Sequence, residues 1–270
     1  MASEVNDVAN GLTPALRRVF SLAKPMKSAI TKTVLREDEL VWEYFGQRAN
    51  GFFIEVGANE PQSGSQTWFF EGKGWRGILV EPQSRLSQQL REGRPRSQVF
   101  QVACGAPGHP KEMPLFVAET SGHSSLVKNL IDADTRYVET EMVKMMTLDA
   151  VLAEVGNPRV DFISIDVEGT QLDVLRGFNL SRHRPALLLL EDHLHNLKVH
   201  AHLRQQGYQL VKRTGLNNWY VPKEQPFAMT TPLERLRLWK KVWGNTPFRK
   251  LRVFLERRRA ARNSARKHAS

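Results

Sequence analysis

The stretch that decides the fold is Phe52-Phe53-Ile54-Glu55-Val56-Gly57-Ala58-Asn59, an apolar run that ends in an acid, a glycine and two small residues. This pattern is typical of a buried parallel strand that stops at a turn open to a ligand. Glycine lets the backbone approach the ligand, because it takes up φ and ψ values closed to other residues. A second such run, residues 77–80, is followed by Glu81. In nucleotide-binding α/β units a carboxylate placed there binds ribose hydroxyls, so the pair predicts a site for an adenosine-containing cofactor.

The turn itself distinguishes between cofactors. A dinucleotide site needs G-x-G-x-x-G so that a helix N-terminus can meet a pyrophosphate. Residues 57–64 read Gly-Ala-Asn-Glu-Pro-Gln-Ser-Gly, without the second glycine and with Glu60 where a phosphate would lie. The turn suits a ligand without phosphate whose cationic end Glu55 could meet, and S-adenosylmethionine has this description. The alternative is structural, with Gly57 closing a tight turn and Glu81 capping a helix.

Two further apolar runs end in acids at Asp166 and Glu191. Ligands bind outside the carboxyl ends of strands in open parallel sheets. Four acid-terminated strands therefore indicate a site at this edge.

Apolar runs alternate with helical patterns along the core of the chain, which predicts a doubly wound α/β sheet. A short link at 214–217 joins the last two runs as a hairpin, so the last strand should be antiparallel. The prediction is a seven-stranded, mostly parallel, Rossmann-like class I methyltransferase sheet. We expect strands at 52–57, 77–81, 98–104, 160–166, 185–191, 208–213 and 217–222, and helices at 37–48, 64–72, 83–92, 148–155, 170–176 and 194–206. The insert 105–147 is less regular, with extra strands expected at 113–118 and 143–147 and a mobile polar loop at 121–125.

The chain resembles the FkbM family of S-adenosylmethionine-dependent methyltransferases over roughly residues 50–222. The resemblance rests on the segments Phe53–Asn59, Trp68–Glu71, Gly74–Pro82, Ser124–Leu126, Met146–Asp149, Ile163–Gly169 and Val174–Phe178. The resemblance implies acceptors such as sugars and hydroxylated natural products. The family usually has an Asp-Gly pair where this chain has Glu60-Pro61, a change that stiffens the loop after Asn59.

The cofactor site predicted from these patterns lies at the first strand ends. It comprises Glu55, Gly57, Ala58, Asn59, Glu81, Pro82, Ala103, Cys104 and Asp166.

Methyl transfer to a hydroxyl needs a base, and three residues are candidates. Asp166 is the first choice because it ends the strand beside the cofactor strand, and Glu168 is a second nearby acid. His193 is the third, since imidazole has the more suitable pKa; it could equally begin a helix. A Mg²⁺ ion held by Asp166, Glu191 and Asp192 is a further alternative.

Cysteine usage and hydropathy bound the compartment. The single cysteine, Cys104, excludes an intramolecular disulfide and suggests a reducing compartment. Neither a membrane-spanning run nor a secretory signal is apparent in the sequence. These features predict a cytoplasmic protein.

The net charge of +11 resides entirely in the C-terminal tail. From Leu233 to Ser270 there are 13 Lys/Arg and 2 Asp/Glu, whereas the remainder holds 26 of each sign. Apolar residues recur there at helical spacing: Leu233, Leu236, Trp239, Val242 and Trp243. Such a helix suits an anionic membrane surface; packing against the body and binding of nucleic acid are the alternatives. We expect three regions: a helical segment (1–49), the methyltransferase domain (50–224) and the basic tail (225–270).

The sequence lacks the Asn/Asp-Pro-Pro-Tyr-like motif of methyltransferases that act on nucleobase amines; residues 166–169 read Asp-Val-Glu-Gly. A hydroxyl acceptor is therefore favoured, on a sugar, a glycan, a glycolipid or a related natural product. Two alternatives stay open. The first is a catalytically silent binding module in which Glu60-Pro61 has spoiled the cofactor turn. The second is an RNA-associated methyltransferase that uses the tail.

Overall fold

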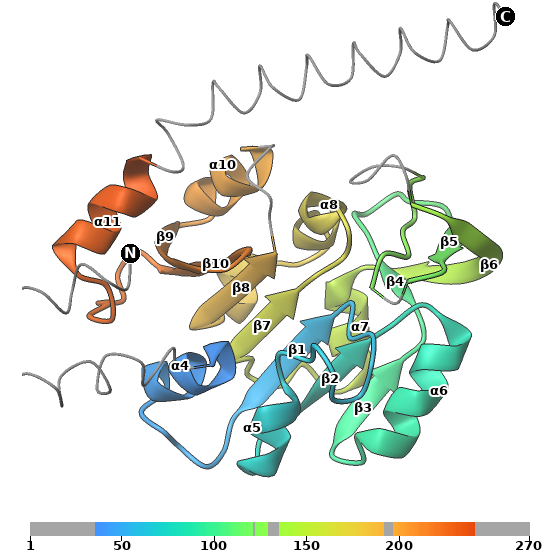
Figure 1. Ribbon diagram of the computed structural model, residues 1–270, viewed down its shortest axis with the longest axis horizontal. Helices are drawn as coiled ribbons and strands as arrows, with labels where there is room; N and C mark the ends of the chain where they lie inside the picture. Colours follow the sequence, from blue (N-terminus) through green and yellow to red (C-terminus); the bar gives the residue numbers. More distant parts are fainter. Residues whose placement is uncertain (1–35, 121, 129–134, 192–196, 241–270) are drawn as a thin grey trace, which may run out of the picture.

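The computed structural model describes residues 36–120, 122–128, 135–191 and 197–240, and within them two sheets (Figure 1). The main sheet has seven strands in the order β3-β2-β1-β7-β8-β10-β9. Their bounds are β1 Phe52–Val56, β2 Arg76–Val80, β3 Ser97–Phe100, β7 Phe162–Ile165, β8 Leu187–Glu191, β9 Tyr208–Thr214 and β10 Asn217–Pro222. All neighbours up to β8 pair in parallel, and β10 pairs antiparallel with both β8 and β9. The predicted α/β class, with seven strands and an antiparallel last strand, is confirmed.

Helices cover both faces of the main sheet (Figure 1). On one face lie α4 (Glu37–Tyr44), α5 (Trp68–Gly72) and α6 (Ser84–Gly93), and on the other α7 (Leu148–Glu154), α8 (Gln171–Arg176), α9 (Leu180–His183) and α10 (Lys198–Gln205). Side chains alternate between the faces along each strand. Phe53 therefore joins the core under α4 and α5, whereas Ile54 and Val56 join the core under α7 and α8.

One predicted strand is divided between two sheets. Residues 98–104 form β3 in the main sheet and a separate β4 (Ala103–Cys104), which pairs with β6 (Tyr137–Met146). β6 also pairs with β5 (Glu112–Ala118), so the predicted extra strands build a three-stranded sheet of order β4-β6-β5. In the loop predicted at 121–125, Ser125 is buried and its backbone pairs with Phe116. The small sheet lies beside the carboxyl ends of the main strands (Figure 1).

Several helix limits differ from the prediction for local reasons. The helix expected at 37–48 ends at Tyr44, because Gly46 and Gln47 adopt positive φ values of 64° and 56°. The helix expected at 64–72 begins only at Trp68, since Ser65 and Gln66 bind Glu55 instead. The short helix α9 was not predicted. The start expected for α10, residues 194–196, lies outside the described residues.

Among the described residues, none of the helices has both the length and the apolar character required to cross a bilayer.

Candidate active site

A cleft opens at the carboxyl ends of β1, β2 and β7. Its lining joins the turn after β1, the end of β2, the start of the small sheet and the loop after β7. Of the sequence-predicted residues it brings together Gly57, Asn59, Glu81, Pro82, Ala103, Cys104, Asp166 and Glu168. Residues 122 and 124–126 close the side formed by the insert.

Gly57 is required by the backbone at the base of this cleft. Its φ is 82°, and a Cβ atom built on it would lie 1.7 Å from the carbonyl oxygen of Asp166. The Gly57 and Ala58 amides donate to the Val80 carbonyl at 2.9 and 3.1 Å. The turn is thereby fixed between β2 and the end of β7, with no side chain on the cleft floor at this position.

Glu81 sits at the end of β2 as predicted, with its carboxylate on the cleft wall. One oxygen accepts from the Asn59 amide at 3.0 Å and the other from the Gln83 amide at 2.8 Å. Burial raises the pKa of Glu81 to about 7, although these two backbone hydrogen bonds oppose the rise. Each oxygen keeps a second lone pair, so the carboxylate can still accept hydrogen bonds from a ligand.

Glu55 and Ala58 do not line the cleft. Glu55 projects to the face under α4 and α5, where its carboxylate accepts from the Ser65 hydroxyl at 3.0 Å, the Gln66 amide at 2.7 Å and the Thr67 hydroxyl at 2.5 Å. Burial raises the pKa of Glu55, and the Thr67 hydroxyl and the Arg94 charge oppose this. Direct contact between Glu55 and a cofactor therefore stays a prediction; the geometry shows a carboxylate that orders the loop after Asn59.

Arg94 completes that loop and was not predicted from sequence. It caps the end of α6 and is fully buried. Its Nε lies 2.9 Å from the Glu71 carboxylate and Nη1 lies 3.8 Å from that of Glu55. The guanidinium also donates to the Pro61 carbonyl at 3.1 Å. The sequence could have indicated such a residue, because Glu55 and Glu71 fall on elements predicted to be buried, and two buried acids require a buried cation.

Ala103 and Cys104 add small buried residues to the cleft lining. Cys104 is buried, which raises the pKa of its thiol to about 12. The thiol is therefore neutral, and Cys104 shapes the wall without serving as a nucleophile.

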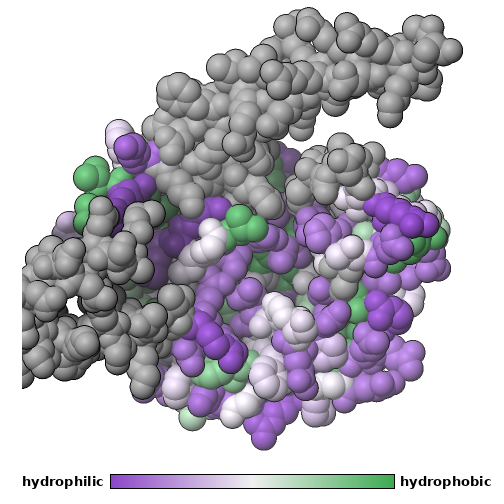
Figure 2. Space-filling view, in the orientation of Figure 1, coloured by the Kyte–Doolittle hydropathy of each residue, from purple (hydrophilic) through white to green (hydrophobic). Residues whose placement is uncertain are grey.

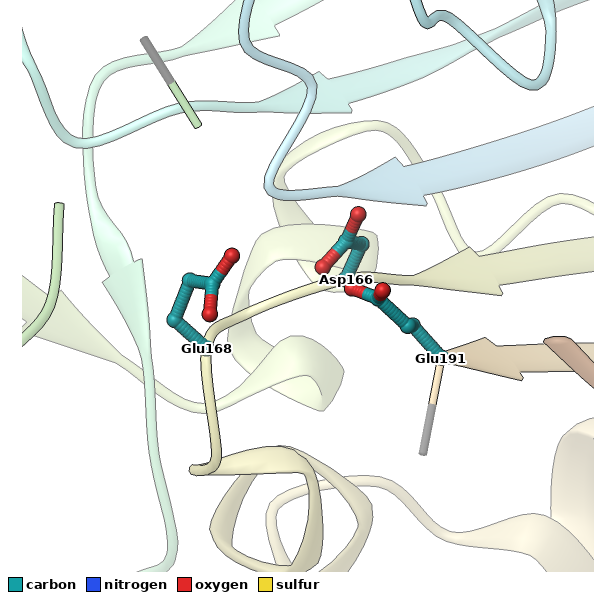
Figure 3. Close-up of side chains that lie close together, drawn as sticks. All are labelled: Asp166, Glu168 and Glu191. Carbon is teal, nitrogen blue, oxygen red and sulfur yellow. The ribbon is translucent and has the colours of Figure 1, made fainter. Parts of the chain in front are cut away.

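Three carboxylates gather at the edge of the sheet beside the cleft: Asp166, Glu168 and Glu191 (Figure 3). One oxygen from each lies within 4.8 Å of the others. Asp166 and Glu168 follow β7, and Glu191 ends β8. Asp166 is exposed to solvent as a residue, although neighbouring protein atoms partly desolvate its carboxylate. This desolvation, together with the hydrogen bond and charge of Glu191, raises the pKa of Asp166.

Glu168 differs from the other two acids in its backbone. Its φ is 47°, in the left-handed region that glutamate rarely occupies, and such strain is concentrated at functional sites. The Glu168 carbonyl accepts from the buried Ser125 hydroxyl at 3.4 Å. Burial and Glu191 raise the pKa of the Glu168 side chain to about 7, whereas His123 lowers it. Glu168 is thus the acid of the cluster that titrates near neutral pH. The other two predicted groups, His193 and Asp192, lie outside the described residues.

The residues fit S-adenosylmethionine better than a nucleotide. The cleft offers carboxylates at Glu81, Asp166 and Glu168, and its described lining residues include neither Lys nor Arg. A ligand that carries a positive charge and no phosphate matches this lining.

Comparison with known proteins assigns the family. The family model for the methyltransferase FkbM domain matches residues 55–210. A search of curated protein sequences found no match. Solved structures with a similar outline include a methyltransferase from Geobacter sulfurreducens (11% identity, 81% of this chain and 96% of that chain, TM-score 0.37). They also include the METTL16 methyltransferase domain (13%, 70% and 68%, TM-score 0.40) and a TehB-like methyltransferase from Corynebacterium glutamicum (9%, 78% and 99%, TM-score 0.37). Because the FkbM match covers more than half of the chain and falls on the cleft described above, this protein belongs to the FkbM methyltransferase domain family.

Proposed function

We propose that this methyltransferase uses S-adenosylmethionine to methylate a hydroxyl of a sugar, a glycan, a glycolipid or a related natural product. The observation that carries the proposal is the carboxylate cluster beside the glycine turn. When bound, S-adenosylmethionine supplies a methyl group on a positively charged sulfur. The protein then has to orient the acceptor and take up the hydroxyl proton.

The carboxylates divide these tasks by their proton affinities. Glu168, with a pKa of about 7, can accept the hydroxyl proton near neutral pH, and we assign it the role of general base. The hydrogen bond and charge of Glu191 raise the pKa of Asp166, so a protonated Asp166 carboxyl can donate to an acceptor hydroxyl. This assignment moves the base from Asp166, the first choice from sequence, to its neighbour. His193 stays a candidate base.

The cofactor half of the cleft is proposed around Gly57, Asn59 and Glu81. Glu81 binds the ribose hydroxyls, and the bare turn at Gly57 admits the rest of the cofactor. The loop supports this proposal over a catalytically silent module. Pro61 is accommodated, because its carbonyl is held by Arg94 while the Asn59 amide remains bound to Glu81.

The experiment separates cofactor binding from chemistry. Calorimetry measures S-adenosylmethionine binding to the full chain, and transfer of tritium-labelled methyl is assayed on sugars, hydroxylated natural products and glycolipids. We expect binding, and label that survives mild base as an ether. No binding would establish the silent module. Base-labile label would indicate carboxyl methylation, and activity restored only by Mg²⁺ after EDTA treatment would indicate a metal at the carboxylates.

A further inference from the structure

Helix α11, Pro232–Trp239, presents an apolar face to solvent at the far edge of the sheet, beyond β9 (Figure 1). The helix begins with a capping box, in which the Thr231 hydroxyl accepts from the Glu234 amide at 3.2 Å and the Glu234 carboxylate accepts from the Thr231 amide at 2.7 Å. Leu233, Leu236 and Trp239 follow at intervals of three and are 55%, 63% and 61% exposed. Figure 2 shows green and purple residues side by side where Figure 1 places α11.

The side of α11 opposite Leu233 holds the helix to the body, mostly through polar contacts. Trp239 borders both sides, because it also lines a groove with Arg235 and Leu238. Arg235 donates to the Phe227 carbonyl at 2.9 Å, and the Glu234 carboxylate lies 3.9 Å from Lys212 Nζ. Leu238, one turn after Glu234, is half-buried on the same side. A surface helix normally turns its apolar side inward. In α11 most of the apolar side faces solvent, which indicates that this side binds a partner outside the described part of the chain.

The positive charge around the exposed apolar face of α11 indicates which kind of partner binds this face. Arg237 and Lys240 lie among the exposed apolar residues, and the sequence from 241 to 270 adds ten Lys/Arg and one Asp/Glu. A second copy of this face would bring like charges together, which opposes self-association. Phosphate contacts with nucleic acid would use the cations but leave the leucines in water. Leucine and tryptophan beside lysine and arginine match the boundary between lipid head groups and acyl chains.

We propose that the outer face of α11 docks on an anionic membrane surface. Leu233, Leu236 and Trp239 enter the acyl boundary, while Arg237 and Lys240 remain among the anionic head groups. This docking does not depend on the proposed acceptor, because α11 does not line the catalytic cleft.

The test is sedimentation of the full chain with vesicles of equal parts phosphatidylcholine and phosphatidylserine, against phosphatidylcholine alone. The chain should sediment with the anionic vesicles only, and less as salt rises. Leu236→Ser with Trp239→Ser should abolish sedimentation. Arg237→Gln with Lys240→Gln should lower the partition coefficient roughly 25-fold, since each charge near the surface contributes about fivefold. The matched control is Met142→Ser on β6, which removes an apolar side chain that is 64% exposed and lies outside α11. This variant should bind the vesicles as the parent does.

All variants should keep the circular dichroism and melting profile of the parent, because the changed side chains are exposed. Four results would overturn the proposal. The first is that the parent does not bind anionic vesicles, and the second is that the α11 variants bind them as well as the parent does. The third is a parent dimer in sedimentation velocity that the Leu236 and Trp239 changes dissociate. The fourth is salt-sensitive binding of RNA by a parent that does not bind vesicles.

Discussion

Glu168 combines an unusual backbone with a carboxyl group that titrates near neutral pH. We expect Glu168→Gln to lower kcat on the order of 10²-fold, because the amide cannot take up the hydroxyl proton. Cofactor affinity should stay unchanged, since Gly57 and Glu81 are untouched. Steady-state kinetics and calorimetry measure the two quantities, with Glu139→Gln on exposed β6 as the control. If Asp166→Asn alone reduces kcat while Glu168→Gln leaves it intact, Asp166 is the base.

Glu81 is the residue whose change should affect cofactor binding most selectively. Glu81→Gln retains the shape of the side chain but lacks one acceptor oxygen, so a hydrogen bond between a charged group and the ribose is lost. We expect binding of S-adenosylmethionine to weaken by about 1–3 kcal/mol in calorimetry. Glu92→Gln on the exposed end of α6 is the control. An unchanged dissociation constant for Glu81→Gln would remove the ribose assignment.

The carboxylate cluster should also make stability depend on pH. The pKa values of Asp166 and Glu168 are raised above those in the unfolded chain, so the folded protein holds more protons between the two sets of values. The contribution of these two carboxyls to the free energy of unfolding is therefore fully present below about pH 4 and is lost as the pH rises through their raised pKa values, about 7 for Glu168. Urea titrations from pH 5 to 8 measure this fall. Glu191→Gln should make it shallower, because it removes the charge that opposes ionisation of both neighbours; an unaltered slope would contradict the coupling.

At the scale of elements, one side chain at the end of α6 holds the loop between β1 and α5. Arg94 contacts the loop backbone at Pro61 and the carboxylates of Glu55 and Glu71. We expect Arg94→Met to destabilise the fold by about 3–5 kcal/mol, because two buried acids lose their cation. Chemical denaturation measures the loss. Arg91→Met, exposed on the same helix, should be nearly neutral, and a similar small loss for Arg94→Met would show that the acids are satisfied by hydroxyls alone.

The existence of the strands and their succession along the chain were predictable, because each apolar run that ends in an acid or a glycine marks where a strand stops. Sheet membership was not. Residues 98–104 read as one strand, yet β3 and β4 belong to different sheets, since the chain bends between Phe100 and Ala103. Hydrophobic periodicity reports local conformation and burial. The partner strand of β4 is instead decided by β6 in the insert, whose paired residues lie 42 positions later in the chain.

In the candidate site, too, local features were predictable from the sequence and long-range contacts were not. The acids after β2 and β7 were placed correctly in the cleft, because the end of a parallel strand fixes where the next side chain lies. Glu55 was expected to meet the cofactor, and its carboxylate faces the helices, since Glu55 shares the side of Phe53 one position before the strand ends; its contact with a cofactor stays a prediction. Arg94 was missed because its role depends on contacts between residues 23–39 positions apart, which local patterns do not report.

At the scale of the whole molecule, cofactor binding is linked to global stability, because the cleft exists only when β1, β2 and β7 are assembled. At S-adenosylmethionine concentrations of 100 times Kd, stability should rise by about 2.7 kcal/mol and Tm by roughly 5–10 °C. Scanning calorimetry measures the shift. Gly57→Ala should abolish it, since the added Cβ collides with the Asp166 carbonyl. A Tm that ignores the cofactor in the parent chain would favour the silent module.

The close approach of Gly57 to Asp166 has a mechanical meaning. The Asp166 amide donates to the Val56 carbonyl at 2.9 Å, while the Asp166 carbonyl occupies the place where a Gly57 side chain would be. Main chain rests on main chain at this point, with no flexible side chain between them to absorb a displacement. The peptide backbone therefore fixes the distance between the turn proposed to receive the methyl donor and the edge proposed to take up the proton. On this proposal, the sheet itself sets the alignment of the two reactants before either one binds.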